Sequence, residues 1–301
     1  LHFDKQSKKH ELSVYPAQMP DGIFRDIYTI NTICSLRSGA ILFGSATGIY
    51  QLNSIKTRLI FYMPRYIPDT VAEVWALYED SKGNIWIGSR LVGLHIFEPS
   101  THKLYHYKHI EGDESSLSNS SVWTIFEDSK GALWLGTDEG LNEVVNTTDI
   151  SDLKFKRFLF TGKQAEHVWN IAESRDGKLY VGTIGEGLFE ISADRTKARH
   201  LDNFPAEIVA SMGLDTVGNL WAGSVNGLYK YNPATDRTTF FSEDDGLASN
   251  DFNFKACIKA PTGEFLFGSK MGITSFHPAK VIPKDLHSVP VRITSLRIAG
   301  Y

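Results

Sequence analysis

Short apolar segments separated by glycine-containing turns recur six times along the chain. The turn glycines are spaced 41 to 48 residues apart, at Gly39, Gly83, Gly131, Gly177, Gly218 and Gly263. Each repeat holds segments of strand length, and no long stretch shows the 3.6-residue period of an amphipathic helix. A fixed period of this size is the signature of repeat architectures. The pattern therefore predicts an all-β protein built from copies of one antiparallel meander.

The second segment of every repeat is apolar at consecutive positions and ends in glycine. These segments are residues 41–44, 85–88, 133–136, 179–182, 220–223 and 265–268. A strand that is apolar on both sides must be covered on both faces, which requires sheets stacked against each other. The fourth segments, such as residues 103–108 and 237–241, alternate with polar residues and suit an exposed edge. Four strands per repeat predict β-propeller blades around a channel, whereas a parallel β-helix needs a shorter period and a leucine-rich solenoid needs helical segments.

The count of repeats leaves a half-unit at the start of the chain. Residues 1–4 resemble a third strand and residues 10–15 a fourth, so residues 1–28 are assigned to the C-terminal half of a preceding blade. Residues 29–287 form the six blades, and we expect a ring of seven; alternatively, the half-blade completes the last unit. Residues 288–301 alternate after a proline-containing linker, which predicts the start of a following β-sandwich domain or a closing outer strand.

Charge and cysteine content exclude several classes of function. The 31 basic and 35 acidic residues are nearly balanced and form no basic run, which argues against a nucleic-acid partner. Two cysteines, Cys34 and Cys257, cannot build a disulfide framework or a four-cysteine metal site. No run of about 18 apolar residues occurs, so we predict no direct membrane insertion of this chain.

Three tryptophans begin the predicted innermost strands and are the first candidates for a binding site. They are Trp75, Trp123 and Trp169, and other repeats place Asn31, Ala210 and Lys255 in the same slot. A slot that accepts polar residues can border solvent, where an aromatic ring can stack on a sugar. Packing in the core is the alternative interpretation. Lys255 is a candidate ligand-binding residue for the same positional reason.

The loops after the second strands should open on the same side of the ring as these tryptophans. They differ from repeat to repeat, and varied loops on a fixed scaffold commonly acquire binding functions. The polar residues in them that could hydrogen-bond a ligand are Arg90, Asp138, Glu186, Asn226 and Lys270. Their alternative interpretation is as solvated loop tips.

Other conspicuous residues have structural explanations. Asp80, Asp128 and Asp215 recur in one turn slot on different blades, which predicts turn capping and not a carboxylate cluster. Tryptophans in the doubly covered strands are predicted to be core residues, and His102, His106 and His109 to be surface residues too far apart for one metal ion. Cys34 and Cys257 are predicted to be small buried thiols. We therefore predict no catalytic residue, no metal site and no cofactor.

The repeated motifs resemble a known family. Asp-Ser-Lys-Gly-Asn-Ile-Trp-Ile-Gly-Ser (80–89) and Asp-Ser-Lys-Gly-Ala-Leu-Trp-Leu-Gly-Thr (128–137), each followed by Gly-Leu, are similar to the regulator-propeller sensor regions of bacterial hybrid two-component systems of Bacteroidetes. Residues 114–119 and 245–253 resemble that family's inter-blade loops. The first and last repeats lack the turn aspartate, at residues 36–39 and 260–263, so we expect their turns to differ.

The resemblance implies a function in signalling. It predicts a periplasmic ectodomain fragment that recognises a glycan-derived oligosaccharide or another small polar ligand. The signal would pass to the rest of the parent receptor, a homodimer with a cytoplasmic kinase that controls transcription. This chain itself is then not an enzyme. Two alternatives stay open: a propeller enzyme such as a streptogramin-inactivating lyase, and a purely structural or dimerisation propeller.

Overall fold

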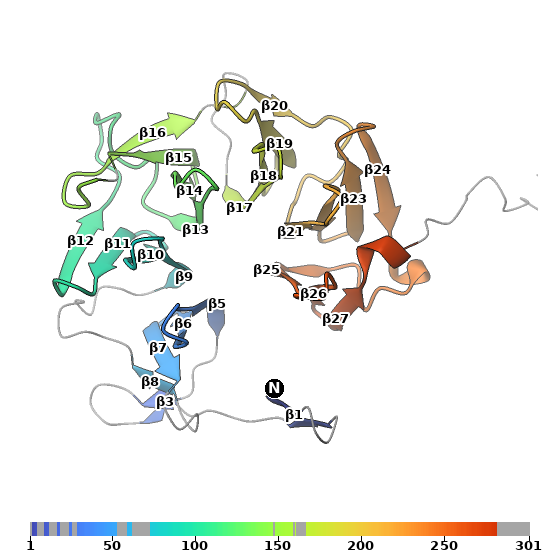
Figure 1. Ribbon diagram of the computed structural model, residues 1–301, viewed down its shortest axis with the longest axis horizontal. Coiled ribbons are helices and arrows are strands. Elements are labelled where there is room, and N and C mark those ends of the chain that lie inside the picture. The colour runs from blue at the N-terminus through green and yellow to red at the C-terminus, as the bar shows by residue number, and fades with distance from the viewer. Residues whose placement is uncertain are drawn as a thin grey trace, which may run out of the picture.

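The chain forms a β-propeller of six blades arranged around a central axis (Figure 1), which confirms the predicted fold class. The computed structural model describes residues 2–4, 9–11, 17–18, 24–25, 29–52, 59–61, 73–146, 148–158, 160 and 167–281. Among these residues, no helix is both long and apolar enough to span a bilayer.

The blades follow one another along the chain. Blades 1 to 3 consist of β5 (Ile30–Ser35), β6 (Ile41–Ser45), β7 (Gly48–Leu52) and β8 (Leu59–Phe61); β9 (Val74–Glu79), β10 (Ile85–Ser89), β11 (Gly93–Glu98) and β12 (Lys103–Tyr107); and β13 (Val122–Glu127), β14 (Leu133–Thr137), β15 (Gly140–Val145) and β16 (Lys154–Phe158). Blades 4 to 6 consist of β17 (Val168–Glu173), β18 (Leu179–Thr183), β19 (Leu188–Ile191) and β20 (Ala198–His200); β21 (Ser211–Leu214), β22 (Leu220–Gly223), β23 (Leu228–Asn232) and β24 (Arg237–Phe241); and β25 (Phe252–Lys259), β26 (Phe265–Ser269) and β27 (Gly272–Phe276).

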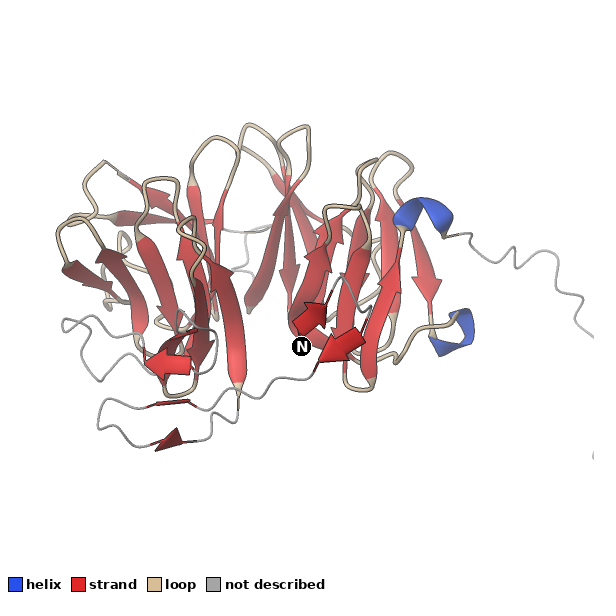
Figure 2. Cartoon of the chain, turned by 60° about the horizontal axis from the view of Figure 1, so that its bottom comes forward, coloured by secondary structure: helices blue, strands red, loops and turns tan. Residues whose placement is uncertain are grey.

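Within each blade, consecutive strands pair antiparallel, and the chain runs from the axis outward (Figures 1 and 2). Short 3₁₀ segments, η1 (Glu243–Asp245) and η2 (Pro278–Lys280), flank blade 6. Blade 6 has three strands in the described part of the chain. Residues 282–301, including the predicted domain at 288–301, lie outside the described residues.

The first residues of the chain divide between two sheets. β1 (His2–Asp4) and β2 (Lys9–Glu11) pair with each other as a separate hairpin. β3 (Ala17–Gln18) and β4 (Phe24–Arg25) extend the sheet of blade 1 through β8. The boundaries proposed at residues 28 and 287 stay predictions.

The recurring aspartates cap the turns between first and second strands, as predicted. Asp80 Oδ1 accepts hydrogen bonds from the backbone N–H of Lys82 at 2.9 Å and of Asn84 at 2.8 Å. Its second oxygen accepts the indole N–H of Trp86 at 2.8 Å. Asp128 and Asp215 receive Trp134 and Trp221 in the same way, at 3.1 and 3.0 Å. Each aspartate therefore joins its turn to the core tryptophan of the next strand, and a chemical role is not needed to explain it.

The turns of the first and last repeats, in which Leu36 and Ala260 stand in place of the aspartate, keep the same backbone geometry. Gly39 N–H donates to Leu36 O at 2.8 Å and Gly263 N–H to Ala260 O at 2.9 Å, as Gly83 N–H does to Asp80 O at 3.0 Å. The expectation that these turns differ was therefore wrong. Because glycine at the last turn position has a positive φ in all repeats, the backbone closes without help from the side chain.

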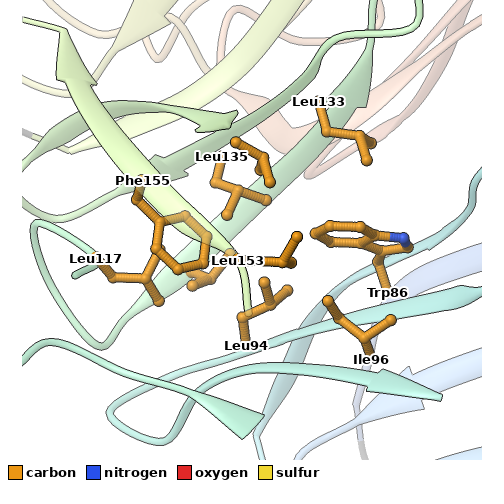
Figure 3. Packing of buried hydrophobic residues seen from close by; sticks show 10 residues of the cluster. Trp86, Leu94, Ile96, Leu117, Leu133, Leu135, Leu153 and Phe155 are labelled. Atoms are coloured by element: carbon orange, nitrogen blue, oxygen red, sulfur yellow. The ribbon is translucent and has the colours of Figure 1, made fainter. Parts of the chain in front are cut away.

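The core consists of apolar layers between neighbouring blades. Trp86, Trp134 and Trp221 are fully buried in the second strands of their blades, as predicted. Figure 3 shows one layer, in which Trp86 of blade 2 faces Leu133 and Leu135 of blade 3. This packing covers both faces of a second strand, which explains why these strands do not alternate.

Glutamates at the ends of innermost strands also connect neighbouring blades. Glu127 of β13 accepts hydrogen bonds from the backbone N–H of Ser81 at 2.8 Å and from its hydroxyl at 2.5 Å. Glu173 of β17 accepts the same two groups of Ser129 at 2.6 and 2.9 Å. A turn of one blade is thus fixed to the innermost strand of the next, an interaction that the sequence analysis did not predict.

Candidate functional site

The candidate tryptophans occupy β-bulges at the start of the innermost strands. In blade 2, Val74 pairs with Ser89 and Ala76 pairs with Gly88, which leaves Trp75 as the extra residue. Trp123 and Trp169 are the extra residues at equivalent bulges. A bulge bends the strand and changes the direction of one side chain. These bulges bring tryptophans from three blades into contact.

The three indoles pack against one another. Ring centroids are 4.5 Å apart for Trp123 and Trp169, which are nearly parallel, and 5.1 and 5.6 Å from Trp75 to these two, in edge-on contacts. Trp123 and Trp169 are only 7% and 8% exposed, whereas Trp75 is partly exposed. The facing sides of Trp123 and Trp169 are therefore occupied by each other and are not free to stack on a ligand.

Blade 6 contributes a phenylalanine and a lysine to the same cluster through a longer bulge. Phe252 pairs with Ser269 and the register resumes only at Cys257, opposite Phe267. Phe254 lies 4.8 Å from Trp169 between ring centroids and is 42% exposed. Lys255 Nζ donates to the backbone oxygen of Trp75 at 2.9 Å. We call Trp75, Trp123, Trp169, Phe254 and Lys255 the axial cluster.

The polar atoms of the axial cluster are mostly hydrogen-bond donors. Burial lowers the pKa of Lys255 to about 7, and its amine lies 5.8 Å from the centre of the Trp169 ring, within cation–π range when charged. The indole N–H groups of Trp75 and Trp169 are buried without a hydrogen-bond partner. Buried donors without partners are rare and costly. An acceptor-rich ligand that reached them would satisfy these groups.

Of the five predicted loop residues, Asp138 reaches the axial cluster. Its Oδ1 accepts the indole N–H of Trp123 at 2.5 Å and lies 2.8 Å from His167 Nδ1. The prediction that these loops and the tryptophans lie on one side of the ring is therefore confirmed for this blade. We call this side, where second strands end and innermost strands begin, the upper face.

The other predicted loop residues lie in the equivalent loops of blades 2, 4, 5 and 6. Arg90 forms an ion pair with Glu73 at 3.2 Å, and Lys270 forms one with Asp251. Each acidic partner, Glu73 or Asp251, immediately precedes the innermost strand of the same blade. The backbone N–H of Arg90 and that of Lys270 also donate to the backbone oxygens of these partners. Glu186 and Asn226 are exposed. The structure places these residues near solvent and does not assign them a ligand.

The sequence analysis missed Phe254, His167 and Glu73. The sequence contained a signal for Phe254. Trp75 follows Val74 directly, whereas two additional residues stand between Phe252 and Lys255, which occupies the same slot in blade 6. His167 and Glu73 have positive φ angles of 48° and 49°. Each residue is the last one before an innermost strand, and this position is seen only in the folded backbone.

The predicted surface histidines include one that stacks on a buried histidine. His106 lies parallel to His95, with ring centroids 4.1 Å apart, across the β11–β12 pair. His102 and His106 are exposed and His109 is partly exposed. In the described part of the chain, no three His, Cys, Asp or Glu residues are arranged to hold a metal ion.

Acid should destabilise the protein through His95. Burial, and then repulsion from His106, lower the pKa of His95 to about 4. The unfolded chain binds this proton near pH 6.5 and the folded chain does not, so the folded state loses stability as pH falls below 6.5. Between pH 7 and pH 5 the loss from this group is about 2 kcal/mol.

This prediction is tested by urea denaturation at both pH values. His95→Phe should remove most of this loss of stability between pH 7 and pH 5, because phenylalanine does not bind a proton. His102→Gln, at an exposed site on the same blade, should leave the pH dependence unchanged. If both variants lose stability with acid as the unchanged chain does, His95 is not the responsible group.

The two cysteines, which were predicted to be small buried thiols, are partly buried. Both lie in innermost strands, in blades 1 and 6. Burial raises the pKa of Cys257 to about 12 and also raises that of Cys34. A thiol with a raised pKa is a weak nucleophile. Neither cysteine is therefore suited to nucleophilic catalysis.

A cleft lies at the opposite end of the ring from the axial cluster. Its volume is about 680 Å³, and its walls are turn residues of blades 1 to 3 such as Arg37, Ser81 and Ser129. Glu79 and Glu127 also line it, and both already bind a neighbouring blade. Glu79 accepts the backbone N–H of Arg37, and Glu127 accepts that of Ser81. The upper face is therefore the better candidate for ligand binding.

Comparisons with known proteins agree with the fold and the repeats. The family described as "Two component regulator propeller" matches residues 70–90 and 116–139. Histidine kinase P4 of Formosa agariphila is 27% identical over 188 residues, which are 61% of this chain and 14% of that protein. The chain therefore spans a small part of that relative's length.

Solved structures with the same fold include extracellular domains of putative two-component systems and a lyase. The extracellular domain of a putative hybrid two-component system from B. thetaiotaomicron superposes with a TM-score of 0.67 and 23% identity, covering 83% of this chain and 34% of that one. A streptogramin B lyase superposes with a TM-score of 0.61 and 16% identity, covering 85% and 83%. At these identities the likeness shows the fold alone.

Proposed function

We propose that this chain, whose residues 70–90 and 116–139 match the two-component regulator propeller family, is the ligand-sensing part of a hybrid receptor that recognises glycan-derived oligosaccharides on its upper face. Support comes from the relative named a histidine kinase and from the structurally similar extracellular domain of a putative hybrid two-component system. We accordingly propose a location outside the cytoplasm, in the periplasm. The bound state would be relayed through the rest of a homodimeric parent to its kinase.

The axial cluster is the observation that carries this proposal. It combines aromatic surface on Phe254 and Trp75 with the unpartnered indole N–H groups and the Lys255 amine. Sugars present apolar C–H faces and many acceptor oxygens, so aromatic rings beside donors suit them. The loops around the cluster add charged groups such as Arg90 and Lys270 that can exchange their present partners for ligand hydroxyls.

Enzymatic activity of the lyase type has weaker support. Such chemistry needs a base positioned near the substrate and commonly a metal ion. The titratable groups in or beside the axial cluster include Lys255, Asp138 and His167, and Asp138 already accepts a hydrogen bond from the indole N–H of Trp123 and contacts His167. The repeats match a signalling family, whereas the lyase shares the fold only.

Calorimetry with the intact parent ectodomain and a panel of glycan oligosaccharides tests the proposal. We expect at least one oligosaccharide to bind, and Phe254→Ala to weaken it by about tenfold or more, which corresponds to about 1.4 kcal/mol. Val217→Ala is the matched control, since Val217 is an exposed apolar residue on a turn away from the upper face, and it should bind normally.

Two results would oppose the proposal. No binding by any oligosaccharide would argue against direct glycan sensing. Unchanged affinity after replacing Phe254 and, in separate variants, Trp75, Trp123 and Trp169 with alanine would favour the purely structural or dimerisation propeller. Turnover of a substrate that a chelator abolishes would favour the enzyme.

A further inference from the structure

Lys255 is a basic group of the axial cluster that has no carboxylate partner in the described part of the chain. Its side chain is partly buried. Among the described residues, its Nζ has one hydrogen-bond partner, the backbone oxygen of Trp75 at 2.9 Å. A protonated amine carries three N–H donors. Two donors of the charged form are therefore unused.

A cleft of about 530 Å³ between β5 and β25 reaches this residue (Figure 1). Its walls include Asn31 and Ile33 of blade 1 and Phe254 and Ile258 of blade 6, together with Lys255. Of the described residues in these walls, Lys255 is the only basic one and none is acidic. A ligand in the cleft would therefore meet an amine, an exposed aromatic ring and no repelling carboxylate.

The acidic side chains on the strands and loops around this amine are already bound to other groups. The pairs are Glu73 with Arg90, Glu79 with Arg37, Glu173 with Arg195, Asp251 with Lys270 and Asp138 with His167. The neighbouring strands β21 and β26 contain no titratable residue. The counter-ion of a charged Lys255 must therefore come from outside the described residues.

We propose that Lys255 binds a carboxylate or sulfate group of the ligand, so that the oligosaccharide of the proposed function is an acidic one. A buried charge without a counter-ion is costly, and a bound anion removes this cost. The unpartnered indole N–H groups of Trp75 and Trp169 are further donors in the same cluster, and Phe254 is available to the sugar ring. This assignment rests on the proposed sensing function and adds the charge of the ligand.

An acidic ligand should also change the protonation of Lys255. Burial lowers the pKa of Lys255 to about 7, so about nine-tenths of the free amine is neutral at pH 8. An anion beside the amine favours its charged form, and binding therefore takes up a proton at pH 8 but hardly any at pH 6. Cys257, which also lines the cleft, has a pKa raised to about 12 and stays neutral in this range.

Calorimetry of the intact parent ectodomain with matched oligosaccharides tests this assignment. Each neutral oligosaccharide is compared with one of the same linkage in which a hexose is replaced by its uronate, and with one that carries a sulfate at the same carbon. At pH 6 an acidic member should bind at least about tenfold more tightly than the neutral one, and the two acidic arms show which anion the site takes. That affinity should fall about tenfold at pH 8, where buffers of different ionisation enthalpy should report uptake of about 0.9 proton.

A variant that keeps the length of the side chain and removes its charge identifies the group responsible. Lys255→Met should bind the neutral and acidic members with similar affinity and take up no proton. Lys259→Met is the matched control, since Lys259 is exposed on the same strand and also donates to a backbone oxygen; it should keep the preference for the acid. Any pH dependence left in Lys255→Met belongs to other groups, such as His167 beside Asp138.

Three outcomes would overturn this assignment. Equal affinity of the unchanged chain for neutral and acidic oligosaccharides would refute it and leave the proposed glycan sensing standing. A preference for the acid that persists in Lys255→Met would place the anion at another group. Binding of no oligosaccharide would contradict the sensing function and this assignment together. Because the preference and the proton uptake are measured on the unchanged chain, the test does not depend on the folding of a variant.

Discussion

Replacing Gly136 with alanine is expected to lower the free energy of unfolding by about 3 kcal/mol, at the upper end of overpacking effects. A Cβ atom at this position would lie 2.4 Å from the backbone oxygen of Val168 and 2.7 Å from its side chain. Gly136 belongs to β14 of blade 3 and Val168 to β17 of blade 4. Because the clash involves backbone, the two blades would have to separate. Urea denaturation of the variant measures the loss.

The equivalent glycine of blade 6 is the control. Gly268 has no neighbouring described blade, and a Cβ there meets the side chain of Ala256 at 2.9 Å but a backbone atom only at 3.7 Å. Gly268→Ala should cost less, about 1 kcal/mol. Equal losses for the two variants would mean that the close approach of blades is not the reason for glycine in this slot.

Removing the Asp128 carboxylate is expected to cost about 3 kcal/mol, because the largely buried Arg195 loses its nearer partner and keeps only Glu173 at 3.4 Å. Asp128 accepts the indole N–H of Trp134 at 3.1 Å and pairs with Arg195 at 2.7 Å, and both charged side chains are largely buried. Burial raises its pKa, but the bonds from Arg195 and Trp134 outweigh this effect and the net pKa is lowered. Its contribution should therefore be lost as the pH falls through its folded pKa.

Two further variants separate the causes of this loss. Asp215→Ala removes the same turn cap and indole bond without an arginine partner and should cost less than Asp128→Ala. Asp152→Ala removes an exposed pair with Lys154 and should change the stability by less than about 0.5 kcal/mol. If Asp128→Ala is no worse than Asp152→Ala, the buried network does not stabilise the blade interface.

The sequence alone predicted the repeat, the turns and the core because these are local properties. Asp80 and Gly83 specify a turn by their own side chain and backbone freedom. Trp86 could be assigned to the core because its whole strand is apolar. A continuous apolar pattern is typical of strands that are covered on both faces. These features recur with each copy, so each repeat supported the others.

The arrangement at the axis could not be predicted in the same way. The slot of Trp75, Trp123 and Trp169 was recognised, but contact between them depends on bulges and on the curvature of the ring, which bring together residues about 45 and 90 positions apart. The ring also decides that Trp123 and Trp169 cover each other. The contact of Lys255 with Trp75 spans the axis and joins residues 180 positions apart, beyond any local pattern.

A crystal structure of the parent ectodomain with the tightest oligosaccharide from the panel tests the central claim most directly. The account predicts a sugar ring on the upper face, against Phe254, with its oxygens accepting hydrogen bonds from the axial cluster or the surrounding loops. Oligosaccharide bound elsewhere, with the upper face of this propeller unoccupied, would contradict it.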